Sequence, residues 1–167
     1  MEPTRLNAPA LLLRQGDAAD EQAAIEVMRA AMGTYSDWCP DWSLPHDMEA
    51  RERVRWRAAD SSSQRLVACV GERVVGVSVS KRAPIAVLSL LMVAPMAWGT
   101  GVAARLHDRA LQDAAACSSI AIRLTVPEGN GRARRFYEKN GWRRTSATAQ
   151  THSWLGLPML EYAQDLT

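Results

Sequence analysis

The segment of this sequence that most constrains the fold is a long apolar run that leads through a glycine-containing turn into a helix pattern. The run Ile85–Val93 reads IAVLSLLMV, and a strand that is apolar at nearly every position is expected to be central and covered on both faces. Pro95 ends it, because proline cannot donate a hydrogen bond to a sheet. Gly99 and Gly101 follow, and a helix is expected over Val102–Ala116.

This strand–turn–helix order can hold a phosphate group. The first turn of a helix has unpaired N–H groups and the positive end of the helix dipole. Glycines let the backbone approach a ligand closely, so Gly99 and Gly101 before the helix suit a pyrophosphate. Alone, such a turn is as often a simple tight turn. The sequence contains neither the GxGxxG pattern of dinucleotide folds nor the GK[ST] of nucleoside triphosphate sites.

The rest of the chain predicts a mixed α+β layered domain. Apolar residues at helical spacing predict helices over residues 21–32 and 130–140. Arginines and acids that alternate at helical spacing predict another helix over residues 47–59. The strands are expected over residues 11–14, 65–70, 73–81, 119–126, 142–149 and 159–163. Gly71 and Glu72 form the turn of a hairpin between the second and third strands. The length of 167 residues suits a single domain, residues 1–167.

Composition excludes several classes of protein. The 20 basic and 18 acidic residues leave a net charge of +2, so a nucleic acid or an anionic membrane is not the expected partner, although all basic residues except Lys81 and Lys139 are arginine. Neither a membrane-spanning run nor a secretory pattern is present, so a cytoplasmic protein is expected. Cys39, Cys69 and Cys117 are widely spaced and match no metal-ligand pattern, so they are expected to be reduced thiols without a metal.

A second segment, NGRARRFYEKNGW from residue 130 to residue 142, narrows the class of protein further. The first segment has the pattern Val93-x-Pro95-x-x-Trp98-Gly99-x-Gly101-x-Ala103. The second has Asn130-x-x-Ala133-x-x-Phe136-Tyr137-x-x-x-Gly141-Trp142. Together, in this order, they resemble the GNAT family of acyl-CoA-dependent N-acyltransferases, and the resemblance covers nearly the whole chain.

The resemblance implies a fold and a co-substrate. The fold would be a central, mostly antiparallel twisted sheet flanked by helices, in which the fourth strand splays from the fifth. The pantetheine arm of acetyl-CoA would lie in that gap and pair with strand backbone, as an added strand would. The implied cofactor-binding residues are Met92, Val93, Trp98, Gly99, Thr100, Gly101, Val102, Ala103, Asn130 and Ala133.

The resemblance also implies a catalytic acid, Tyr137. Its hydroxyl would protonate the leaving thiolate, while a neutral amine attacks the thioester directly and backbone N–H groups hold the oxyanion. The alternative is that Tyr137, beside Phe136, is an aromatic residue of the core.

Two positions depart from the family pattern. Trp98 stands where Gln or Arg is usual, so it either packs against the ligand or is only a packing residue; the arginines that could supply charge nearby are Arg105, Arg132, Arg134 and Arg135. The strand Ile85–Val93 has no ionisable residue, although a glutamate often serves there as base. The candidate bases elsewhere are Asp37, Asp41, His46, Glu49 and His152.

The loop over residues 35–45 lies where family members bind the acceptor. Its candidate substrate-binding residues are Tyr35, Asp37, Trp38, Asp41 and Trp42. Tryptophan faces and carboxylates suit a cationic or aromatic amine, although the tryptophans can also simply anchor a proline-rich loop. The arginine-rich helix after this loop is interpreted as a solvated face with i,i+4 ion pairs.

The function expected from these features is transfer of an acetyl group from acetyl-CoA to the primary amine of a small molecule or peptide. The alternative is a non-catalytic module that binds acyl-CoA, and a nucleic-acid-binding protein has only the arginines in its favour. The resemblance leaves a homodimer open. The sequence does not name the acceptor.

Overall fold

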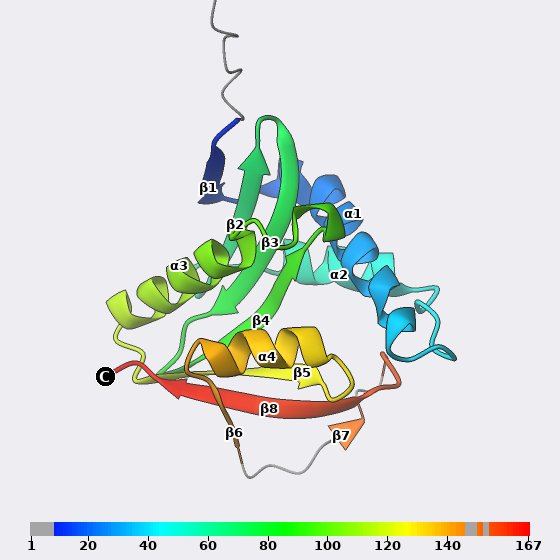
Figure 1. Cartoon of the computed structure of the whole chain (residues 1–167). Coiled ribbons are helices and arrows are strands. Elements are labelled where there is room, and N and C mark those ends of the chain that lie inside the picture. Colours follow the sequence, from blue (N-terminus) through cyan, green and yellow to red (C-terminus); the bar gives the residue numbers. More distant parts are fainter. Residues whose placement is uncertain (1–8, 146–149, 152–153) are drawn as a thin grey trace, which may run out of the picture.

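The computed structural model describes residues 9–145, 150–151 and 154–167. Its strands form one eight-stranded sheet in the order β1-β2-β3-β4-β5-β8-β6, with β7 paired to β8 (Figure 1). The strands are β1 (Leu11–Gln15), β2 (Ser63–Val70), β3 (Arg73–Lys81), β4 (Ile85–Val93), β5 (Ala121–Pro127), β6 (Arg143–Arg144), β7 (Gln150–Thr151) and β8 (Pro158–Asp165). The helices are α1 (Glu21–Gly33), α2 (Met48–Arg57), α3 (Val102–Ala116) and α4 (Gly131–Lys139), with short 3-10 turns η1 (Ala18–Asp20), η2 (Thr34–Asp37) and η3 (Pro95–Ala97).

Helices cover both faces of the sheet, with α3 and α4 on one side and α1 and α2 on the other (Figure 1). The side chains along β2 show why both faces of the sheet need a covering layer. Val67 packs in a cluster with α1 residues, whereas its neighbour Leu66 packs in a cluster with Val102 and Leu106 of α3. Because successive side chains of a strand point to opposite faces, two cores form from one sheet.

The sheet separates between β4 and β5. These two strands are the parallel pair, and their register covers Ile85–Val87 against Ala121–Arg123 alone. Beyond Val87, β4 stays paired with β3, and Ser89 is an extra residue there, because Leu88 and Leu90 face consecutive residues of β3. A bulge of this kind bends a strand and increases its twist. β5 meanwhile follows β8 over its whole length, so the two strands diverge.

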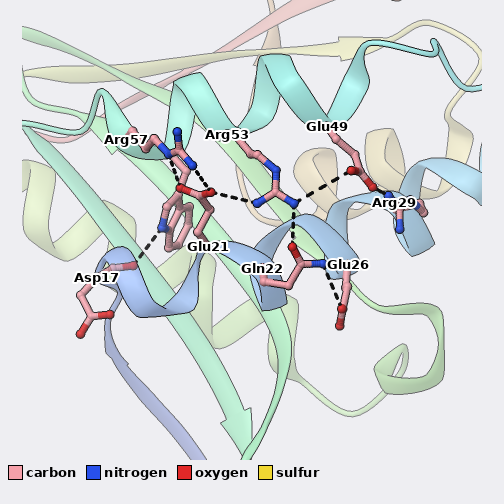
Figure 2. Close-up of polar contacts among 9 residues, drawn as sticks. Asp17, Glu21, Gln22, Glu26, Arg29, Glu49, Arg53 and Arg57 are labelled. Carbon is pink, nitrogen blue, oxygen red and sulfur yellow. Dashed lines mark hydrogen bonds and ion pairs between the residues drawn. The ribbon is translucent and has the colours of Figure 1, made fainter.

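The helix α2 is held against α1 by a set of ion pairs (Figure 2). The carboxylate of Glu21 accepts hydrogen bonds from Arg53 at 2.9 Å and from Arg57 at 2.6 Å. Arg53 also bonds Gln22, and Glu49 pairs with Arg29 of α1. These contacts join α2 to α1, while Met48 and Trp56 are buried on the face of α2 that packs on the core.

On the opposite face, a buried hydrogen bond joins α3 to the segment after α4. Trp142 donates its indole N–H to Nε2 of His107 at 2.8 Å, and His107 Nδ1 lies 2.9 Å from a carboxylate oxygen of Asp108. An indole can only donate, so Nε2 accepts and the imidazole proton is on Nδ1. This contact holds α4 and its C-terminal end close to α3.

The predicted order of elements is confirmed, including the hairpin of β2 and β3 at Gly71 and Glu72. Boundaries differ by a few residues: the predicted strand over 119–126 begins at Ala121, because Ser119 donates its hydroxyl to Ala83 in the turn before it. The helix expected over 130–140 begins after Asn130, whose side chain caps it.

Two expectations need correction. The strand β4 is not covered throughout on both faces: Ile85 is 50% exposed and Ser89 is exposed, because β4 begins at the rim and then parts from β5. The strand expected over residues 142–149 is described only at β6, since Trp142 is a core residue and residues 146–149 lie outside the described part; β8 is longer than the expected 159–163.

The described helices include none that combines the length and the apolar character needed to cross a membrane. Cys39, Cys69 and Cys117 are free thiols. Among the described residues, no cluster of three or more His, Cys, Asp or Glu is placed to hold a metal ion.

Candidate active site

A cavity lies where β4 and β5 diverge. It encloses about 120 Å³, whereas one water molecule needs about 10–15 Å³ by the same measure, so it accepts a group much larger than water. The elements that line it are β4, β5, α1, η2, α2, α4, the start of β8 and the segment before β8. Its lining includes Tyr35, Glu52, Arg55, Met92, Asn130 and Tyr137. Residues 88–92 of β4 and 124–127 of β5 line it, beyond the point where the two strands cease to pair.

Tyr137 reaches the cavity from α4 and is 8% exposed. Its ring packs edge-on against Phe136 and Trp142, with ring centres 5.4 and 5.7 Å away. Burial raises the pKa of the phenol above its usual value, and the nearby Tyr35 adds to the rise. Tyr137 is therefore protonated at neutral pH, as an acid must be before it acts. The same burial would also raise the pKa of a thiol leaving group, so the pKa of the phenol and the pKa of the thiol shift in the same direction.

Asn130 stands at the start of α4, as expected from the sequence. Its side-chain oxygen accepts a hydrogen bond from the backbone N–H of Ala133 at 3.2 Å, so it caps the helix. Asn130 and Ala133 both line the cavity beside Tyr137. The cap thus stabilises the first turn of α4, which borders the cavity between β4 and β5.

Glu52 is a residue of the cavity that was not predicted from the sequence. It is 1% exposed and lies on the buried face of α2 with Met48 and Trp56, one helical turn from each. The interpretation of this helix as a solvated face is therefore wrong for Glu52, although the i,i+4 pair of Asp47 and Arg51 is present. The spacing Met48–Glu52–Trp56 was the available signal, because residues four apart share one face of a helix.

The Glu52 carboxyl is poorly satisfied where it lies. Nε of Arg55 is 3.4 Å from its Oε2, but no donor among the described residues makes a hydrogen bond to that oxygen. Burial raises the pKa of Glu52, and the charge of Arg55 partly offsets the rise. Arg55 itself donates to the carbonyl of Ser89 at 3.1 Å, so it connects α2 to the bulge of β4.

The turn after β4 has the geometry that an anion site requires. Gly99 and Gly101 have φ values of +76° and +88°, and both are exposed. Only glycine adopts such values without strain. Gly101 directly precedes α3 and has no side chain to cap it, so the first N–H groups of the helix remain available. Thr100 is exposed at the tip, whereas Val102 is buried and anchors the turn to the core.

Trp98 opens this turn and is half-buried. Its indole N–H donates to the carbonyl of Val93 at 3.0 Å, and the guanidinium of Arg132 lies 3.9 Å from its ring centre. The structure is compatible with both interpretations of Trp98. The indole packs on the end of β4, and its half-buried ring also leaves surface that a ligand can contact. Val93 is buried in the core beneath α3, while its neighbour Met92 lines the cavity.

Of the arginines that could supply charge to the turn, Arg132 lies over the ring of Trp98. Arg134 donates to the Tyr162 hydroxyl and to the carbonyl of Glu128. Arg105 donates to the carbonyl of Leu11. Because α4 begins next to the turn, its first residues bring Arg132 over Trp98.

The proposed acceptor loop divides into two groups. Tyr35 is buried and lines the cavity, and burial with the nearby Glu52 charge raises its pKa to about 12. Trp38 and Trp42 pack on Tyr35 at 4.9 and 5.3 Å between ring centres, and Trp42 donates to the carbonyl of Leu155 at 2.7 Å. They anchor the loop, whereas Asp37 and Asp41 are exposed and do not line the cavity.

The candidate bases that belong to the described part of the chain are not brought to the cavity. His46 is exposed, and Glu49 pairs with Arg29 on the outer side of α2. Neither residue is part of the cavity lining. His152 lies outside the described residues. Glu52 is the one carboxylic acid among the described lining residues.

A sheet whose fourth and fifth strands part over a cavity, followed by a glycine turn at a helix start, defines an acyl-CoA-dependent acyltransferase fold. The model of the acetyltransferase (GNAT) family matches residues 31–142. The chain belongs to this family, and the protein is therefore an enzyme of the acetyltransferase class. The family uses acyl-CoA. No curated protein sequence matches the chain.

Solved structures share the fold at low sequence identity. An acetyltransferase of the GNAT family from Staphylococcus aureus Mu50 has a TM-score of 0.76 at 16% identity, over 95% of this chain and all of that one. PaiA N-acetyltransferase from Thermoplasma acidophilum, solved with coenzyme A, has a TM-score of 0.72 at 16% identity, over 93% and 99%. The ribosomal-protein-S18-alanine N-acetyltransferase from Escherichia coli has a TM-score of 0.75 at 13% identity, over 95% of both chains.

Proposed function

We propose that the protein transfers an acetyl group from acetyl-CoA to the primary amine of a small molecule or peptide, by direct attack of the amine. The observation that carries the proposal is the cavity at the divergence of β4 and β5, with Tyr137 on its wall. Acetyl-CoA supplies an activated thioester to this site. A relative in fold was solved with coenzyme A, which agrees with this choice of donor.

The residues present suit acyl-CoA. The free edge of β4 around Met92 offers backbone groups to the pantetheine amides, as strand addition does. The turn from Trp98 to Ala103 offers helix N–H groups to the pyrophosphate, and Arg132 adds a positive charge beside it. Asn130 and Ala133 border the same gap from α4.

In this proposal, Tyr137 is the acid. Its buried hydroxyl, protonated at neutral pH, donates to the sulfur as the thiolate leaves. The backbone of β4 at the cavity holds the carbonyl oxygen while charge develops on it. Tyr35, which lines the same cavity, contacts the acceptor, and Trp38 and Trp42 keep the ring of Tyr35 in place.

A thiol-release screen of the full chain with acetyl-CoA against a panel of primary amines tests the proposal. We expect thiol release that depends on the amine and equals the amount of N-acetyl product found by mass spectrometry. Saturable acetyl-CoA binding without release with any amine would instead favour the non-catalytic acyl-CoA-binding module.

A further inference from the structure

We infer that Glu52 is the general base that takes the proton from the ammonium group of the acceptor. The inference rests on the proposed function, because it assigns a role within that reaction. An amine at neutral pH is mostly protonated and has no lone pair for attack, so a base must remove one proton first. The strand β4 has no ionisable residue to do so.

The position of Glu52 supports this role. Its side chain is 1% exposed and borders the cavity from α2, while Tyr137 borders the same cavity from α4. The base and the acid thus enter from opposite faces of the sheet, one from each side of the divergence. An amine that lies between them would face the carboxylate while the leaving sulfur faces the phenol.

The side-chain oxygen Oε2 of Glu52 supports its role as the general base independently of its position. A buried polar atom without a hydrogen-bond partner is rare in folded proteins, and Oε2 of Glu52, which has only the ion pair with Arg55, is such an atom among the described residues. Glu52 is one of the residues that line the cavity, so this oxygen lies at the edge of the space that an acceptor would enter. An ammonium ion carries up to three N–H donors, so an acceptor amine would satisfy the oxygen on binding.

The charges around Glu52 affect how readily its carboxyl ionises, and a base must be ionised before it accepts a proton. Arg55, on the same helix, favours the ionised carboxylate at 3.4 Å, while burial opposes ionisation. Tyr35 of η2 and Tyr137 of α4 are the other titratable groups that line the cavity; a phenol is already neutral at physiological pH, and burial raises the pKa of both further. Residues 88–92 of β4 add no charge.

Glu52 and Tyr137 together account for every proton that the reaction moves. Glu52 takes the first proton from the ammonium ion, which leaves a neutral amine. The amine nitrogen bonds to the thioester carbon, and the C–S bond then breaks. Tyr137 donates its proton to the sulfur, and the second proton of the nitrogen restores Tyr137. Glu52 finally releases its proton to solvent, so the products are the amide, the free thiol and one proton.

The test compares Glu52→Gln with wild type over a range of pH, with the best amine of the screen. We expect turnover to fall about 100-fold at pH 7. The deficit should shrink as the pH rises toward the pKa of the amine, because bulk water then supplies neutral amine. Glu26→Gln, an exposed glutamate on α1, is the matched control and should keep wild-type turnover.

A second measurement separates catalysis from folding. Because burial raises the pKa of Glu52, ionising it costs the folded state stability, and this loss grows as the pH rises above the ordinary carboxyl value. Glu52→Gln should therefore melt at an equal or higher temperature than wild type at pH 8 while its turnover is low. If wild type acetylates no amine, the proposed function fails and this assignment with it. If wild type is active and Glu52→Gln matches its turnover at every pH, only the assignment of Glu52 is overturned.

Discussion

The guanidinium of Arg132, at the start of α4, lies 3.9 Å from the centre of the Trp98 ring. This distance is typical of a cation–π contact, which is strongest on tryptophan. Trp98 occupies the position where a cationic or amide side chain is usual in the family. Arg132, from another helix, places a positive charge over the indole at this turn.

Removal of this charge should weaken donor binding. We expect Arg132→Ala to raise the acetyl-CoA dissociation constant about tenfold, since a charge-assisted hydrogen bond contributes about 1.5–3 kcal/mol. Arg109→Ala is the control, because it removes an equal charge from α3 at an ion pair with Asp113. If both variants bind acetyl-CoA like wild type, Arg132 does not contact the phosphates.

Tyr137→Phe tests the acid. The phenyl ring preserves the packing on Phe136 and Trp142, so only the hydroxyl is lost. We expect kcat to fall by about 100-fold with less than a twofold change in acetyl-CoA affinity. Steady-state kinetics and calorimetric titration on the same preparation measure both quantities. Wild-type kcat in this variant would remove Tyr137 from the chemistry.

The conformation of the turn before α3 can be tested with a matched pair of glycines. Gly101 has φ +88°, so Gly101→Ala should destabilise the fold by about 1–2 kcal/mol from backbone strain alone and should weaken acetyl-CoA binding. Gly33 has φ −58°, and no atom lies within 4 Å of the place that an alanine methyl would take there. Gly33→Ala should therefore cause no loss of stability, or a gain of up to about 1 kcal/mol. Urea unfolding measures the two changes. Equal effects at both glycines would refute the strained-turn interpretation.

The stability that the ion pairs of Glu21 with Arg53 and Arg57 contribute between α1 and α2 should depend on pH. Hydrogen bonds from Arg57 and then Arg53 lower the pKa of Glu21 from 4.5 to about 2. A lowered carboxyl pKa gives stability that is fully present above the unfolded value and is lost as the pH falls through the folded value. Glu21→Gln should thus be less stable than wild type at pH 7, and the difference should narrow between pH 4.5 and 2. Glu72→Gln in the exposed β2–β3 turn should track wild type across this range in urea unfolding.

The sequence predicted the elements well because local signals mark them. The apolar run Ile85–Val93, the turn at Gly71 and the cap at Asn130 each act within a few residues. The short strands near the C-terminus were harder, because β6 has two residues and its place in the sheet depends on pairing with β8. Such pairing is set by tertiary contacts and leaves little local pattern.

The site was predictable only in part. Tyr137 and Asn130 stand in a motif with fixed spacing, and the structure brings both to one cavity. Glu52 was missed because its neighbours in the sequence are arginines, which suggest an exposed helix. Its burial follows from the packing of α2, in which Glu52 lies on the same buried face as Met48 and Trp56. The partnership of Trp98 with Arg132 likewise depends on how α4 packs beside the turn.

The central claim is that the gap between β4 and β5 binds acetyl-CoA, and calorimetric titration of the full chain with acetyl-CoA tests it most directly. We expect one site per chain with a dissociation constant on the order of micromolar, equivalent to about 8 kcal/mol. The absence of any binding signal up to millimolar acetyl-CoA would contradict the account.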